Sequence, residues 1–326
     1  MTASVQPRSI MSAGWAAVDG YFFPRTTAVR LAALRIIFCV LQLTWFLDPR
    51  AGYLRMLEGD GFRNPQRIIA VMVKILGEDV VHSPQFVGGL WYATVAAGVL
   101  ATIGLFSRVT MLAFGLGNLI LISFLYSFGE RHHPEAVFLI TLILIGLGPC
   151  GQCLSVDAWL RRGRDPARWG PRAQTNMAMW PILLAQWLLC IAYFEAFAAK
   201  IQHSGLAWMN GYTLQSFLLS DAVRRDLPLG LFLAQYREVC MLMAAGALAI
   251  EGGFFLVMFH RWRPLRRVIP WIFIQGLLLH TMIYLTQQAS FFQFMALYLM
   301  WVPWERWLVR ERAAIPALAQ PRALAA

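Results

Sequence analysis

Long apolar stretches alternate with short polar and basic segments along the 326 residues of the chain. Several of these stretches reach the roughly 20 residues that an α-helix needs to cross the hydrocarbon core of a bilayer. They lack the strict alternation of apolar and polar residues that spanning β-strands require. The pattern therefore predicts eight membrane-spanning helices, at roughly 27 to 47, 87 to 106, 109 to 128, 134 to 152, 177 to 198, 239 to 259, 268 to 286 and 289 to 305.

Two segments between the predicted spans mix apolar and charged positions, which favours helices that lie in the membrane interface. The first runs from 64 to 79, and four of its apolar residues share one helical face: Ile68, Met72, Ile75 and Leu76. The second runs from Gly211 to Arg237 and carries its charged residues at its centre. We expect a loop with an interfacial helix there.

The composition supports an integral membrane protein of the all-α class. Hydrophobic residues make up 59% of the chain, against roughly 45 to 50% in a typical soluble domain, and the mean hydropathy is +0.56. The formal net charge of +11 comes from arginines in short loops and near the ends. Because no basic stripe is interleaved with base-stacking aromatic residues, we expect the lipid bilayer and not a nucleic acid as the partner.

The arginine-rich segments predict the orientation. With eight spans, the segments before span one, between spans two and three, four and five, and six and seven, and after span eight all fall on one side. The positive-inside rule makes that side the cytoplasm. The sequence thus predicts a multi-pass protein of the inner (plasma) membrane with a cytoplasmic segment at 1–26, a membrane domain at 27–305 and a short cytoplasmic tail at 306–326. The first span is expected to act as the targeting signal, since no removable signal peptide is found.

Five cysteines lie in or beside apolar runs, where reduced thiols behave as small hydrophobic groups. Cys150 and Cys153 form a CxxC pattern, which occurs in redox and zinc sites. No second pair completes a zinc site, so a structural role is favoured and no metal is expected. Common hydrolase and nucleotide-binding motifs are absent from the sequence.

Few ionisable residues occur within the predicted spans, and such residues are by default candidates for a functional site. They are Arg35, Glu195, Glu251 and, at an outer end, Lys200. Residues of this kind often pair with one another across helices. We expect Arg35 to pair with Glu251.

Lys200 is harder to explain as an anchor. The 28 basic residues include only two lysines, Lys74 and Lys200. Arginine keeps its proton in proteins, whereas a desolvated lysine can lose it and act as a base. Glu195 is five residues away, about 140° around a helix, so it is poorly placed to hold Lys200 charged. His203 is one turn away. The alternative is that Lys200 meets lipid headgroups at a helix end.

Histidines add to the outer half of the predicted bundle. His132 and His133 lie between spans three and four, and as an adjacent pair they make a weak metal site. His280 lies in the outer half of span seven, where a satisfied structural histidine is the simpler interpretation. Six polar residues nevertheless converge on this half, which predicts one pocket: Lys200, His203, His132, His133, Glu195 and His280.

Several sequence segments, in order, resemble the HTTM family. They are "RLAALRIIFCVLQL", "GLFSRVTML", "RHHPEAVFLI", "LGPCGQCLSVDAWL" and "YFEAFAAKIQHSGLAWMNGY". This family is the membrane domain shared by vitamin K-dependent gamma-carboxylase and its bacterial relatives. The resemblance covers about residues 20 to 307, and its most specific part is Lys200 followed by Trp208, Gly211 and Tyr212.

The resemblance implies a carboxylase-like enzyme of the carbon-carbon lyase class. Lys200 would deprotonate a vitamin K-type hydroquinone, and His132 or His133 would assist the proton handling. Oxygen addition to the reduced quinone would then give a base strong enough to remove a proton from a substrate carbon that captures CO2. The supporting polar pocket would comprise Glu195, His203, Trp208, Tyr212, Glu251 and His280.

Two departures from the carboxylase pattern are visible. The animal carboxylase has two adjacent lysines where this chain has Ala199 and Lys200, and it carries a large propeptide-binding domain after the membrane part. A peptide substrate would therefore dock on the outer segments 48–86 and 201–238, or on a partner protein. The alternative is a non-enzymatic maturation, export or binding partner for a secreted peptide.

Overall fold

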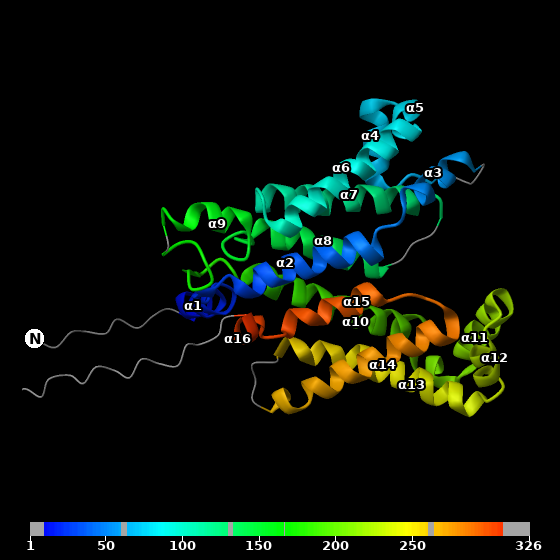
Figure 1. Ribbon diagram of the computed structural model, residues 1–326. Helices are drawn as coiled ribbons and strands as arrows, with labels where there is room; N and C mark the ends of the chain where they lie inside the picture. The colour runs from blue at the N-terminus through cyan, green and yellow to red at the C-terminus, as the bar shows by residue number, and fades with distance from the viewer. Residues whose placement is uncertain (1–9, 60–63, 130–132, 166, 260–263, 309–326) are drawn as a thin grey trace, which may run out of the picture.

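The protein is a bundle of long helices, as the computed structural model shows for residues 10–59, 64–129, 133–165, 167–259 and 264–308 (Figure 1). Six helical stretches are long and apolar enough to cross a membrane, judged by length and composition. They are α2 (Val29–Leu41) with the π-helix η1 (Gln42–Phe46), α6 (Pro84–Ile103), α7 (Ser107–Tyr126), α10 (Trp180–Ser204) with η2 (Gly205–Asn210), α13 (Arg237–Phe254) with η3 (Phe255–Phe259), and α14 (Ile269–Gln287) with η4 (Leu265–Arg267). The all-α membrane class is confirmed.

The predicted count of eight spans is not confirmed. The other two apolar segments form shorter helices, α8 (His133–Leu147) and α15 (Phe292–Leu297) continued by η5 (Tyr298–Trp301). The 15 residues of α8 rise only about 22 Å, less than the roughly 30 Å of a bilayer core. Both helices pack among the longer ones, with α8 against α7 and α10, and α15 against α8.

Short elements join the long helices. They are α1 (Ile10–Phe22), α3 (Arg50–Glu58), α4 (Arg67–Leu76), α5 (Glu78–Val81), α9 (Val156–Arg162), α11 (Tyr212–Arg225), α12 (Pro228–Ala234), α16 (Trp304–Leu308) and the two-residue strands β1 (Thr26–Thr27) and β2 (Gln174–Thr175). The strands pair antiparallel, with Thr26 opposite Thr175. Both segments that were predicted to contain interfacial helices are helical, as α4 and as α11 with α12.

The apolar residues of α4 are divided between the bundle and the exposed surface. Ile68 and Met72 do contact the core, and Ile69 is fully buried between them. Ile75 and Leu76 are exposed. The face that meets the bundle is therefore centred on Ile69, and the exposed residues at the end of α4 are free to meet lipid.

Local sequence signals explain where the long helices begin and end. The hydroxyl of Ser83 accepts a hydrogen bond from the backbone N–H of Phe86 at 3.1 Å, and Pro84 follows in the first turn of α6, as is common at helix starts. Gly104 ends α6 in the left-handed conformation, with φ of +76°. A Cβ there would lie 2.9 Å from a guanidinium nitrogen of Arg35, so the position favours glycine twice over.

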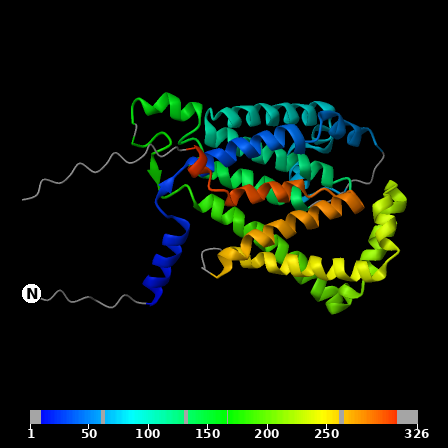
Figure 2. The same cartoon turned by 60° about the horizontal axis from the view of Figure 1, so that its bottom comes forward.

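The two ends of the bundle differ in character (Figures 1 and 2). In both views α9 and α1 lie at one end and α11 and α12 at the other. The described arginine-rich segments belong to the α9 end, which is also where β1 meets β2 and where Arg30 of α2 pairs with Glu305 of α16. The grouping of these segments agrees with the predicted topology, while the membrane side that this end faces stays a prediction.

Candidate functional site

Lys200 lies within a helical stretch and not at its end. The α10 helix continues to Ser204, and the 3₁₀-helix η2 extends the same candidate span to Asn210. The predicted span ends near 198, two residues before Lys200, whereas the helical stretch ends ten residues after it. Lys200 therefore stands on a continuous helix that packs against α13, and not on a loop.

The ammonium group of Lys200 meets the carboxylate of Glu251 on α13. Its Nζ donates to both carboxylate oxygens at 2.8 Å and lies 3.4 Å from the carbonyl oxygen of Ala196. It also lies 5.4 Å from the centre of the Trp208 ring, a cation–π distance. The side chains of Lys200 and Glu251 are 22% and 13% exposed. Lys200 of α10, Trp208 of η2 and Glu251 of α13, all predicted members of the pocket, thus form one group. We call the two charged residues the Lys200–Glu251 pair.

The expected pairing of Arg35 with Glu251 is wrong. Arg35 on α2 is fully buried, and its guanidinium donates to four backbone carbonyl oxygens, those of Ala101, Thr102, Cys150 and Leu154. Two of these carbonyls belong to the last turn of α6, where a helix leaves carbonyls without helical partners. Arg35 is therefore satisfied by main-chain acceptors, and Glu251 is free for Lys200.

The Trp-x-x-Gly-Tyr motif after Lys200 ties α10 to the start of α13. Gly211 has φ of +85°, and a Cβ there would lie 2.8 Å from the carbonyl oxygen of Arg237, so only glycine allows this approach without strain. The guanidinium of Arg237 lies 4.6 Å from the centre of the Tyr212 ring. This junction sets where α13 begins, and hence where Glu251 stands along it.

The remaining residues of the predicted pocket are more scattered. Glu195 is exposed on α10 and makes no hydrogen bond or ion pair with the described part of the chain. His203 is exposed and its Nδ1 lies 2.7 Å from the carbonyl oxygen of Ala199. The α8 helix begins at His133, and His132 lies outside the described residues.

His280 belongs to a buried polar chain. Its Nε2 shares a hydrogen bond with the hydroxyl of Tyr193, which lies 2.5 Å from the hydroxyl of Tyr298. Phe254 stacks on Tyr193 with ring centres 4.0 Å apart. Tyr193 is also within electrostatic range of Glu251. The chain therefore lies among α10, α13, α14 and α15, and Phe254, which stacks on Tyr193, follows Glu251 by three residues on α13.

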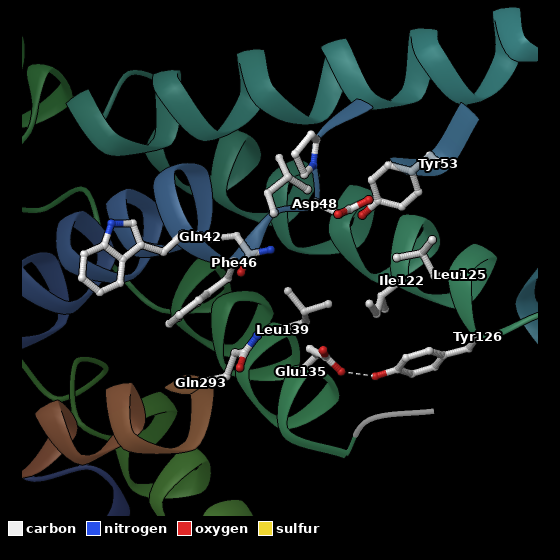
Figure 3. A pocket seen from close by; sticks show the side chains of 13 residues that line it. Gln42, Phe46, Asp48, Tyr53, Ile122, Leu125, Tyr126, Glu135, Leu139 and Gln293 are labelled. Carbon is white, nitrogen blue, oxygen red and sulfur yellow. Dashed lines mark hydrogen bonds between the residues drawn. The ribbon is translucent and has the colours of Figure 1, made fainter. Parts of the chain in front are cut away.

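A separate cavity of about 320 Å³ lies where η1, α7 and α8 meet (Figure 3). The hydroxyl of Tyr126 donates to the carboxylate of Glu135 at 2.5 Å on one side, and Asp48 and Tyr53 stand on the other. Gln293 of α15 completes the lining. Burial raises the pKa of Asp48 more than the charge of Arg55 lowers it, and burial raises the pKa of Tyr53 well above its usual range.

This cavity and the Lys200–Glu251 pair are distinct places. Neither Lys200 nor Glu251 lines the cavity. The two are bridged by α15, where Gln293 lines the cavity and the next residue, Phe294, packs its ring against Tyr193 with centres 5.4 Å apart. The α8 helix starts at His133, two residues before Glu135, which lines the cavity.

Comparison with known proteins adds one match. The family model of the HTTM domain matches residues 23–306, which is nearly the whole chain. The chain belongs to the HTTM family. No curated protein and no solved structure matches it.

Within this HTTM domain the cysteines serve packing. All five are free and buried. Burial raises the pKa of the Cys150 thiol to about 11 and that of Cys153 to about 12, more than the charge of Arg35 lowers them. Neutral buried thiols are poor nucleophiles and poor metal ligands. Among the residues that the structure describes, no group of three or more His, Cys, Asp or Glu side chains is placed to hold a metal.

The sequence analysis of the HTTM domain missed the polar groups that carry no formal charge. Tyr193 and Tyr298 complete the buried chain of His280, and Gln42 and Gln293 line the cavity. Gln42 donates to the side-chain oxygen of Asn118 at 2.7 Å. Amide and phenol groups inside apolar runs were the available signal, since they are rarely left without partners in a membrane.

Proposed function

We propose that the protein is a quinone-using membrane enzyme of the vitamin K-dependent carboxylase type, in which Lys200 and Glu251 form the acid–base centre. The observation that carries the proposal is the contact of Lys200 Nζ with both oxygens of Glu251 at 2.8 Å inside two candidate spans. Ionisable residues are unfavourable in a bilayer and are retained where they act. The pair sits beneath Trp208 of the motif that carries the family resemblance.

The pair changes how Lys200 acts as a base. An ammonium held by a carboxylate keeps its proton, so a lone neutral amine is not the resting form that this geometry favours. The amine becomes available when the proton moves along the 2.8 Å hydrogen bond to Glu251. This transfer leaves both groups neutral, so no uncompensated charge remains in the water-poor bundle. Glu251 is then the proton store and Lys200 the base.

A reduced quinone fits the surroundings of this pair. Lys200 and Glu251 keep 22% and 13% of their side-chain surface exposed within candidate spans, so a lipid-soluble molecule would reach them from the bilayer. The Trp208 ring offers a flat surface beside the ammonium. Bound there, the reduced quinone would supply, with O2, the strong base that the carboxylation of a carbon by CO2 requires.

His132 or His133 is the proposed second group for proton handling, and Glu135, which follows them in the chain, lines the cavity of Figure 3. The α8 helix starts at His133, and Glu135 two residues later lines the cavity with Tyr126. Glu135 and Tyr126 form a short hydrogen bond there. A histidine near this point would exchange protons with the acidic lining and with solvent.

Quinone turnover by purified protein tests the proposal. Lys200→Arg keeps the charge but not the ability to release a proton, so oxygen-dependent quinone turnover should fall at least about 100-fold, the usual contribution of a general base. Lys74→Arg is the matched control, because Lys74 is exposed on α4 and is the only other lysine. It should leave turnover unchanged. Lys200→Ala with an added small amine should recover part of the activity.

Two results would contradict this function. Equal turnover in Lys200→Arg and wild type would remove the lysine from the chemistry. Purified wild type that retains a secreted peptide and shows no quinone turnover would favour the alternative, a non-enzymatic maturation, export or binding partner in which the ion pair only holds α10 to α13.

A further inference from the structure

A basic cavity of about 550 Å³ lies at the turn between α6 and α7, and neither Lys200 nor Glu251 lines it. Arg108 at the start of α7, Arg161 at the end of α9, and Arg168 with Trp169 in the following loop all line it. Segments far apart in the sequence thus bring three positive charges to one hollow.

The charges of this cavity are largely uncompensated. Asp157 is the acidic residue in the lining, and it is buried and already accepts from the backbone N–H groups of Phe106 and Ser107 at 3.0 and 2.7 Å. Arg161 stacks on Trp169 at 4.8 Å, and a stacked guanidinium keeps its donors for a ligand. The side chain of Arg168 makes no hydrogen bond or ion pair with the described residues.

The rim of the cavity is apolar and faces outward. Phe106 and Val109 line it and are 64% and 69% exposed. They sit between the end of one candidate span, Ile103, and the first turn of the next. The ends of membrane spans lie where the acyl chains of a bilayer meet its headgroups. The arginines are therefore placed to meet a headgroup, and the apolar rim is placed to meet acyl chains.

We infer that this cavity binds the phosphodiester headgroup of an anionic phospholipid. Arginine donors arranged around a hollow suit phosphate oxygens, and basic pockets between membrane helices bind anionic lipids. Phe106 and Val109 would then contact the first methylenes of the acyl chains. The site shares no residue with the Lys200–Glu251 pair, so it does not rest on the proposed enzymatic function.

The test is a titration of the detergent-solubilised full chain with phosphatidylglycerol, followed by native mass spectrometry and thermal unfolding. The double variant Arg161→Gln with Arg168→Gln is compared with Arg164→Gln with Arg172→Gln, which removes the same charge from the same loop outside the cavity lining. We expect the apparent dissociation constant for phosphatidylglycerol to rise about 25-fold in the first and less than about threefold in the second, at about fivefold for each cavity arginine.

Two further sets of measurements control for misfolding of the double variant and for binding of other lipids or of phosphate. The single variant Arg168→Gln disturbs no intramolecular hydrogen bond and should show about a fivefold loss even if the double variant folds poorly, whereas Arg168→Lys should retain most of the binding. Phosphatidylcholine should bind weakly, and inorganic phosphate alone should not stabilise the protein. Equal losses in the two double variants, equal binding of phosphatidylcholine, or equal stabilisation by inorganic phosphate would each overturn the lipid site.

Discussion

Two cations lie inside the bundle, and their surroundings differ in kind. Arg35 is fully buried and bonds only to backbone carbonyl oxygens. Lys200 keeps 22% of its side chain exposed and bonds to a carboxylate that can itself take up a proton. Neutral carbonyls stabilise a charge without accepting its proton, while a carboxylate in contact offers a place for the proton to go.

Arg35 has the surroundings of a structural charge, whereas Lys200 has a partner to which its proton can move. Arg35 joins α2 to the last turn of α6 and to the turn after α8, and it uses the residue type that never deprotonates. Lys200 joins α10 to α13 through a single partner. The contacts of Arg35 hold three segments together and offer no acceptor for a proton. The contact of Lys200 with Glu251 holds two helices together and allows proton transfer.

The largest effect is expected from Arg35→Met. The substitution removes all donors to the four carbonyls, and buried acceptors left without partners cost about 1 to 3 kcal/mol each, although such costs do not add fully. We expect at least about 3 kcal/mol lower stability and poor recovery from the membrane. Thermal unfolding in detergent measures this loss, and a variant within about 1 kcal/mol of wild type would show that Arg35 does not hold these turns.

The cysteine next to Arg35 should be inert. Burial raises the pKa of Cys150 from 9.0 to about 11, which lowers its thiolate fraction at pH 8 about 100-fold. Because the folded value is the higher one, alkylation should accelerate as the pH rises toward 11. Mass spectrometry after iodoacetamide treatment, with denatured protein as the reference, measures this rate. Labelling as fast as in the denatured chain would mean that the surroundings of Arg35 are open to solvent.

A smaller effect is expected at the Lys200–Glu251 pair. Removing one partner leaves a charge uncompensated, and removing both does not. We expect a coupling energy of about 1 to 3 kcal/mol in a double-mutant cycle of Lys200→Met and Glu251→Met. Thermal unfolding of the four proteins gives this value. A coupling near zero would mean that the two residues do not interact in solution.

The smallest effect is expected at His280. A substitution there tests whether the hydrogen-bonded chain of His280, Tyr193 and Tyr298 only stabilises the fold. His280→Phe loses one hydrogen bond to Tyr193, while Tyr193 keeps its contact with Tyr298. We expect about 1 kcal/mol lower stability and unchanged quinone turnover per folded molecule. A strong loss of turnover with normal stability would instead place His280 in the proton path of the Lys200–Glu251 pair.

Much of the fold was predictable because lipid imposes simple rules. Apolar length predicted the six long spans, and the arginines marked segments that gather at the α9 end. The count of eight spans is not confirmed, since an apolar run such as α8 has the same composition whether it crosses the bilayer or packs as a short helix among longer ones. The predicted fifth span ends near 198, although α10 and η2 continue to Asn210.

The sequence by itself determined the class of the protein and its HTTM motif and made Lys200 a candidate, because each depends on residue type and spacing along one chain. Only the tertiary structure decided that Glu251 meets Lys200 and not Arg35. Spanning helices are apolar on most sides, since lipid is as apolar as the protein interior, so periodicity does not show which face turns toward which neighbour. The partners of a buried charge depend on which carbonyls and carboxylates the fold places near it. For Arg35 these are carbonyls in the last turn of α6. For Lys200 the close approach of Gly211 to the start of α13 positions the helix that carries Glu251.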